Sequence, residues 1–312
     1  MISQPTSQTR VQMFSKRIKL ILLSRAAWFY ALVWVASLAY LVASGNRIIG
    51  SVGFAAGILL FCALTVALTK EEPLAAQVRT DQSVTLRWLQ LGIVILAISI
   101  TAYSGFLFNM RPGQPTNIPV WSTVVNFFGN LGARFLGPLV DNSPALAGAN
   151  PAKYVFIPLV LLLISGVRFS ELGFRRGHRV WQVIVLWASI PVLFLVFQVV
   201  TGTANLLYLF RTFLGHFLKN GFSEEFLFRG AFQTRLRLFM KADWALVIQA
   251  LVFGLWHLGF DTQTMGGDWV AGLALGIASH SIFGLAMGIL FQRTRNLIAP
   301  SVIHVLINMF GN

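Results

Sequence analysis

Long apolar runs separated by short polar links fill most of the chain. A helix needs about 20 apolar residues to cross the roughly 30 Å hydrocarbon layer of a membrane. The runs that approach this length are 27–43, 48–68, 88–108, 154–167, 180–200, 244–258, 270–291 and 297–310. They predict an all-α fold, a polytopic membrane helix bundle with about eight transmembrane helices, the shorter of which pack inside the bundle.

The composition agrees with a chain embedded in lipid. Of its 312 residues, 56% are hydrophobic and only 11% are charged, whereas an ordinary soluble domain has about 25% charged residues. The mean hydropathy is +0.72. We therefore expect an integral, multi-pass membrane protein that is surrounded by the lipid bilayer.

The net charge of +14 does not indicate a nucleic-acid partner, because Lys and Arg are spread over the links instead of forming one basic patch. The basic links are 16–25, 70–87, 168–179, 235–241 and 293–295. The positive-inside rule predicts that the amino terminus and these links are cytoplasmic, and we expect the cell membrane as the location. The link 259–269 has two acids and no Lys or Arg, and is expected on the outer side.

The sequence divides into three regions. Residues 1–24 read as a cytosolic basic tail, residues 25–203 as an amino-terminal transmembrane region, and residues 204–312 as a segment in which polar side chains enter the apolar runs. An ionisable group inside a membrane span costs about 2.5 to 3.5 kcal/mol. Function is therefore sought in the third region.

The stretch GFSEEFLFRG, residues 221–230, places two glutamates among aromatic side chains. On a helix Glu225 and Arg229 share a face, with the acid on the favourable amino-terminal side. Glu224 is turned by about 100°, so it is left without this partner and becomes a candidate proton acceptor. The same stretch also fits a surface helix that begins after a break at 219–221 and is capped by Ser223.

Two later segments carry further polar pairs. Phe253 and His257 are one turn apart at the end of one apolar run, and His304 and Asn308 are one turn apart in the last run. Together with the glutamates they supply a carboxylate to take a proton from water, an imidazole to orient that water, and donors for an oxyanion. The other histidines are interpreted as solvated or interhelical hydrogen-bonding side chains: His178, His216 and His280.

The three motifs in this order resemble the signature of the CPBP family, which contains type II CAAX prenyl endopeptidases and bacteriocin-processing or immunity proteins. The stretch ELGFRR at 171–176 is also similar to a segment that precedes the family's core. The resemblance identifies residues 204–312 as a CPBP-like intramembrane peptidase core. The residues that carry it are Glu224, Glu225, Arg229, Phe253, His257, His304 and Asn308.

The resemblance implies an intramembrane endopeptidase that acts on membrane-associated peptides or proteins, including prenylated CAAX-type substrates. Glu224 matches the general base, His257 helps to bind and polarise the attacking water, and His304 with Asn308 stabilises the oxyanion. The positions that shape the site are Glu225, Arg229 and Phe253.

No cofactor is favoured. The chain lacks a His-Glu-x-x-His motif, and Asn308 is a poor zinc ligand but a good oxyanion donor. The alternative is a metalloprotease-like Zn²⁺ site built from Glu224, His257 and His304.

Two other functions stay open. A non-catalytic membrane adaptor or bacteriocin-immunity-type protein would keep the same fold and use the same groups to bind a peptide. A transporter would use them as an ion path, but the sequence has neither a repeated half nor a ladder of acids across its spans.

Overall fold

The computed structural model describes residues 24–69, 81–111, 117–140 and 143–310, and in these ranges all regular structure is helical. The all-α class predicted from the sequence is confirmed. The helices of the first two thirds are α2 (Arg25–Ala43), α3 (Ile49–Leu68), α4 (Val84–Met110), α5 (Trp121–Phe135), α6 (Pro144–Pro151), η2 (Ala152–Phe156), α7 (Ile157–Ile164), η3 (Phe169–Leu172) and α8 (Val180–Val200). Those of the last third are α9 (Leu206–His216), η4 (Phe217–Gly221), α10 (Phe222–Glu225), η5 (Phe226–Gln233), α11 (Thr234–Leu236), α12 (Ala242–Trp256), α13 (Leu258–Thr264), α14 (Trp269–Leu275), η6 (Gly276–Ser281), α15 (Ile282–Thr294) and α16 (Ile298–Phe310).

Several of these labels divide one continuous helix. Residues 206–236 run without interruption from α9 to α11, and residues 269–294 run from α14 to α15. The segments η2, η4, η5 and η6 within such helices are π-helical. π-Helical turns are rare and are frequently found at functional sites. Segments η4 and η5 lie on either side of Glu224 and Glu225, so this part of the chain is a candidate for a functional site.

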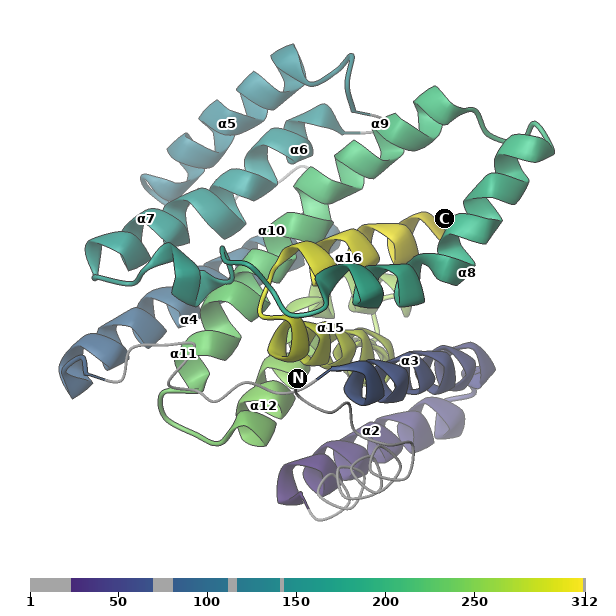
Figure 1. Ribbon diagram of the computed structural model, residues 1–312, viewed down its shortest axis with the longest axis horizontal. Helices are drawn as coiled ribbons and strands as arrows, with labels where there is room; N and C mark the ends of the chain where they lie inside the picture. The colour runs from purple at the N-terminus through teal and green to yellow at the C-terminus, as the bar shows by residue number, and fades with distance from the viewer. Residues whose placement is uncertain (1–23, 70–80, 112–116, 141–142, 311–312) are drawn as a thin grey trace, which may run out of the picture.

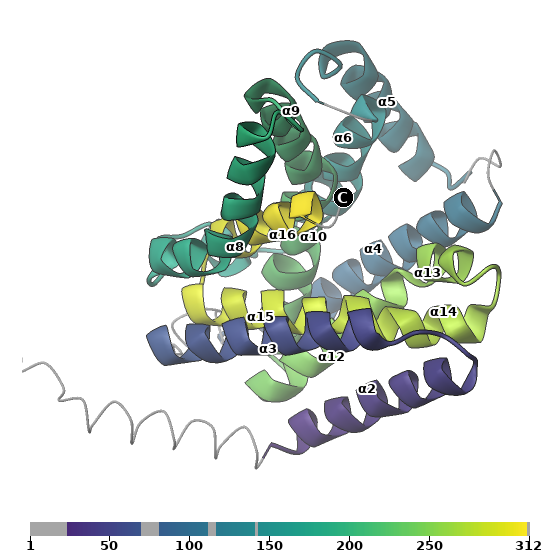
Figure 2. The same cartoon turned by 90° about the vertical axis from the view of Figure 1, so that its right-hand side faces the viewer.

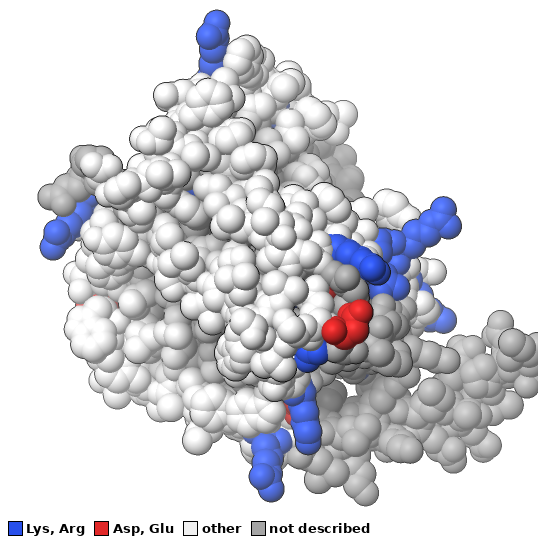
Figure 3. Space-filling view, turned by 90° about the vertical axis from the view of Figure 1, so that its left-hand side faces the viewer, with Lys and Arg blue, Asp and Glu red and all other residues white. Residues whose placement is uncertain are grey.

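Among the described residues, six helices are long and apolar enough to cross a membrane, and the count becomes seven if the pair α12 and α13, bent by 51°, forms one span. The expected number of about eight is not confirmed. The run 297–310 forms α16, whose 13 residues reach only about 20 Å at 1.5 Å per residue. One face of the molecule shows almost no charged side chains, and Lys and Arg lie at its margins (Figure 3), as expected for a surface in contact with lipid.

The predicted cytosolic tail lies almost entirely outside the described residues, as do positions 70–80 of the second basic link. Their cytoplasmic placement stays a prediction.

The polar helices of the last third lie in the middle of the bundle. Helix α16 packs between α8, α10 and α15 (Figures 1 and 2). Helices α2 and α3 cover α14, α15 and η6 on one side, and α4 packs against α12, α13 and η5. The amino-terminal helices therefore enclose the segment in which the sequence places the site.

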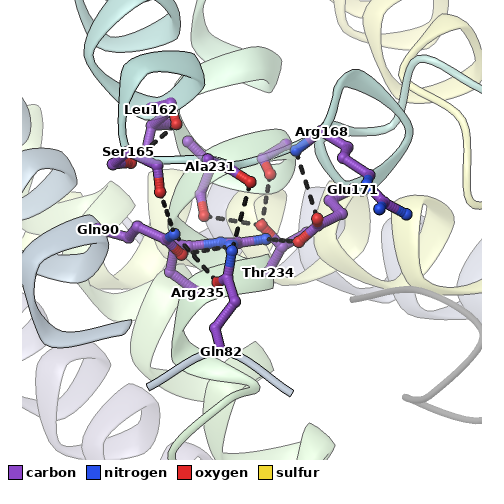
Figure 4. A network of polar contacts seen from close by, with 11 residues as sticks. Gln82, Gln90, Leu162, Ser165, Arg168, Glu171, Ala231, Thr234 and Arg235 are labelled. Atoms are coloured by element: carbon purple, nitrogen blue, oxygen red, sulfur yellow. Dashed lines mark hydrogen bonds and ion pairs between the residues drawn. The ribbon is translucent and has the colours of Figure 1, made fainter. Parts of the chain in front are cut away.

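A buried ion pair ties three elements together close to this segment. The Arg235 guanidinium donates from Nη2 to Glu171 Oε2 at 3.0 Å and from Nη1 to Gln90 Oε1 at 2.7 Å (Figure 4). The Gln90 amide donates in turn to the Ser165 carbonyl at 2.9 Å. Arg235 was placed in a basic link between helices. This placement was wrong, because its side chain is fully buried in α11. A charge in this position is stable only with such partners.

Glu171→Gln should destabilise the protein while keeping the size of the side chain. The substitution takes the carboxylate away from the buried Arg235, and breaking a buried ion pair costs about 3 to 5 kcal/mol. Thermal unfolding in detergent should show a clearly lower Tm. The control is Arg176→Gln, an exposed position in the same segment, which should melt with the parent; equal Tm values for both variants would contradict the role of the pair.

Candidate active site

Glu225 is the centre of a fully buried charged cluster. Its Oε2 lies 3.1 Å from Arg229 Nε in an ion pair, as the four-residue spacing predicts. Its Oε1 lies 2.8 Å from His304 Nδ1, a contact that the sequence did not predict. Because the carboxylate accepts, we assign the hydrogen of this bond to Nδ1. Both oxygens of Glu225 are therefore engaged, and the His304 ring is fixed in orientation.

Glu224 is buried next to this cluster and has a different environment. Its Oε2 is 3.9 Å from His304 Nε2, beyond hydrogen-bonding distance. Within the described part of the chain no side chain or backbone group donates a hydrogen bond to it. His304 thus lies between the two glutamates, with Nδ1 bonded to Glu225 and Nε2 facing Glu224. The Glu224 oxygens remain available to accept a hydrogen bond from a ligand.

Arg229 also organises the surroundings of the cluster. Its Nη2 donates to the Gly284 carbonyl on α15 at 3.2 Å, and its guanidinium carbon lies 4.5 Å from the centre of the Phe253 ring. A guanidinium over an aromatic face is attractive, most of all when both groups are desolvated. Phe253 is therefore placed as a side chain that shapes the site.

His257 lies at the bend between α12 and α13. Its Nδ1 is 2.9 Å from the Phe253 carbonyl, so we assign the ring hydrogen to Nδ1, which leaves Nε2 open to a ligand. The ring centre lies 4.7 Å from that of Phe253. Through Phe253, His257 is thus joined to Arg229 and the charged cluster.

The predicted residues do not all meet at one point. Glu224, Glu225, Arg229 and His304 form one cluster, and Phe253 connects it to His257. Asn308 is half-buried on α16, one turn after His304.

The described residues contain no group of three His, Cys, Asp or Glu side chains placed to hold a metal ion. The alternative Zn²⁺ set of Glu224, His257 and His304 therefore does not fit this arrangement.

The helix that carries the glutamates is not interrupted. The Ser223 hydroxyl donates to the Leu218 carbonyl at 2.6 Å instead of capping a helix start. The alternative interpretation of a break at 219–221 and a capped surface helix was wrong. Gly221 has another role, because a Cβ there would lie 2.4 Å from the Val305 side chain and 3.0 Å from the Ser301 carbonyl. The glycine lets this helix approach α16 closely enough for Glu225 to reach His304.

Sequence reasoning missed a second polar pair. His280, interpreted as an interhelical hydrogen-bonding residue, does bond across helices, with its Nδ1 3.1 Å from Asp261 Oδ2. It also stacks on the ring of His257. Asp261 was placed in an external link, but it is fully buried in the short helix α13. The available indication was its position one helical turn after His257.

A comparison with protein-family models fits this arrangement. Residues 206–310 match the model described as Type II CAAX prenyl endopeptidase Rce1-like, a range that contains all seven residues of the three motifs. We call this matched range, residues 206–310, the Rce1-like region. The resemblance inferred from the motifs is confirmed for this region, and with the apolar helices it supports an intramembrane protease of the CAAX type at the level of the family. No curated protein and no solved structure matches the chain.

Gly221→Ala should disturb the contact between the two helices of the Rce1-like region. The added methyl group overlaps the Val305 side chain, and overpacking of a close contact costs about 1 to 3 kcal/mol. We expect a lower Tm, recovered in part when Val305→Ala is combined with it. Gly57→Ala, where a Cβ meets no atom within 4 Å, is the matched control and should not lower the Tm. A Gly221→Ala protein as stable as this control would disprove the close approach.

Arg229→Ala should impair folding of the Rce1-like region, because it strands the buried Glu225 charge at a cost of about 3 to 5 kcal/mol. The yield of monodisperse protein in detergent and its Tm measure the effect. Adding Glu225→Gln removes the stranded charge and should restore part of the loss. Normal folding and full activity of Arg229→Ala would refute the importance of the pair.

Proposed function

We propose that the chain is an intramembrane endopeptidase in which Glu224 activates water to cleave a peptide bond of a membrane-associated substrate. The observation that carries this proposal is the unequal use of the two glutamates. Glu225 has both oxygens engaged by Arg229 and His304, whereas Glu224 faces His304 at 3.9 Å and accepts no hydrogen bond from the described chain. A buried carboxylate with free acceptor positions is suited to act as a general base.

In the first step Glu224 takes a proton from water while the water oxygen adds to the carbonyl carbon of the scissile bond. The π electron pair of the carbonyl moves to its oxygen, which becomes an oxyanion. His257 Nε2 accepts a hydrogen bond from the same water and orients it. Positioned bases of this kind accelerate proton transfer by about 10²- to 10⁴-fold.

His304 and Asn308 stabilise the oxyanion. Because His304 Nδ1–H is bonded to Glu225, the ring donates from Nε2 to the oxyanion only after it has taken up a second proton from solvent, and the Glu225 carboxylate then stabilises the imidazolium charge. Asn308, one turn further on the same face, supplies an amide donor. When the tetrahedral intermediate collapses, the C–N bond breaks and the leaving amine takes the proton from Glu224, which returns to its carboxylate form.

The substrate class comes from the family match and not from a recognised pocket. We propose prenylated CAAX-type peptides as the first class to test, because the matched family is described as CAAX prenyl endopeptidases. Residues 204–312 form the peptidase core in this proposal, and residues 25–203 the transmembrane helices that surround it. The amino terminus and the basic links lie on the cytoplasmic side of the cell membrane, as the distribution of Lys and Arg predicts.

Glu224→Gln should abolish cleavage and leave folding intact. The variant keeps the shape of the side chain but cannot take a proton, so the rate should fall by about 10²- to 10⁴-fold. A farnesylated CAAX peptide with a quenched fluorophore, supplied to the purified protein in detergent micelles, reports the rate.

Asp268→Asn is the matched control. It makes the same chemical change at an exposed acid that caps α14, and Asn is an equally good cap. Parent and control should cleave at similar rates. A folded Glu224→Gln protein with undiminished activity would rule out the glutamate mechanism, and a parent that binds the peptide without cleaving it would favour the adaptor.

A further inference from the structure

His257 has a close neighbour outside the three motifs. The rings of His257 and His280 are stacked with centroids 4.0 Å apart and an angle of 3° between their planes. The His280 side chain is 27% exposed and covers one face of the His257 ring. The Phe253 carbonyl fixes the Nδ1 edge of His257, and the rings of Phe253 and Trp256 pack edge-on against it. The His280 ring is the neighbour that lies flat on the imidazole face.

A hydrogen bond to Asp261 fixes the position of His280. Its Nδ1–H donates to Asp261 Oδ2 at 3.1 Å, and Asp261 is fully buried. Helix α12, which ends directly before His257, and η6, which contains His280, approach each other at glycines, because a Cβ on Gly254 would lie 2.7 Å from the Gly276 carbonyl. A Cβ on Gly276 would also lie 2.8 Å from Asp261 Oδ2. The glycines therefore make room for both the stack and the carboxylate.

The amino-terminal helices hold the π-helical segment η6 in place. The Trp34 indole of α2 donates to the Ala278 carbonyl at 2.9 Å, and the Tyr30 hydroxyl lies 2.9 Å from Ser281 Oγ. From α3, Ser51 Oγ lies 3.2 Å from Ser279 Oγ. These contacts reach η6 directly before and after His280, and they come from helices outside the matched range 206–310.

We infer that His280 is a positioning residue for His257, held by Asp261 and braced by α2 and α3. Its effect on cleavage rests on the proposed function, in which His257 orients the attacking water. With its Nδ1–H held by the Phe253 carbonyl, the neutral His257 ring presents its Nε2 lone pair to water.

Two measurements test this inference, one with catalysis and one without it. His280→Ala should lower kcat for the farnesylated CAAX peptide by up to about 100-fold, since a misplacement of about 1 Å can cost that much, with little change in KM. Independently, His257 should become more reactive towards diethyl pyrocarbonate, located by mass spectrometry, because its ring face is uncovered.

The matched variant is His280→Phe combined with Asp261→Asn, which keeps a flat ring over His257 and leaves no unpaired buried charge. It should protect His257 as the parent does and recover most of kcat. Trp34→Phe removes one of the two hydrogen bonds from α2 to η6, the one to the Ala278 carbonyl, and should shift both readouts in the direction of His280→Ala. If His280→Ala does not fold, the two measurements are made on Trp34→Phe instead.

The outcomes separate the two proposals. If kcat and His257 reactivity are both unchanged in His280→Ala, the positioning role is overturned and the proposed peptidase function is not affected. The same conclusion holds for Trp34→Phe when that variant replaces His280→Ala. A parent without any cleavage, in which His257 reactivity still follows the expected order, would support the positioning role and overturn the peptidase.

Discussion

The site depends on one buried carboxylate, that of Glu225, held between Arg229 and His304. An ionised group without water is tolerated only when charge and hydrogen-bonding capacity are both matched. Here one oxygen forms an ion pair with the guanidinium and the other a hydrogen bond with the imidazole, so removing one of the three side chains leaves a buried partner unmatched. The cluster joins the helix of the glutamates to α16 and, through the Gly284 carbonyl, to α15. It also leaves Glu224 as the carboxylate that remains free to react.

Spacing along the chain predicted what lies within one helical turn. The ion pair of Glu225 with Arg229 and the placement of Phe253 beside His257 follow from a separation of four residues, and both are present. The contact of Glu225 with His304 joins residues 79 apart in sequence, and that of Arg235 with Glu171 joins residues 64 apart. Such contacts depend on which helices pack together, and no local pattern encodes that choice.

The same limit explains the errors. A polar residue near the end of an apolar run resembles a link residue, so Arg235 and Asp261 were placed in links although packing buries both. The stack of His257 on His280 needs the crossing of α12 and η6 at two glycines, a feature of shape that hydropathy does not record. The count of eight spans is not confirmed for a related reason, since hydropathy does not distinguish a short apolar helix that packs among other helices, such as α16, from a full-length span.

The central claim is that water attacks the peptide bond and that Glu224 only carries a proton. A single turnover of a farnesylated CAAX peptide in water enriched in oxygen-18 tests this claim most directly. The account predicts that the new carboxyl terminus carries oxygen-18 and that the Glu224 carboxylate keeps its original oxygens, as measured by mass spectrometry of product and protein. Unlabelled product together with oxygen-18 in Glu224 would show that the glutamate itself attacks the carbonyl, and would contradict the account.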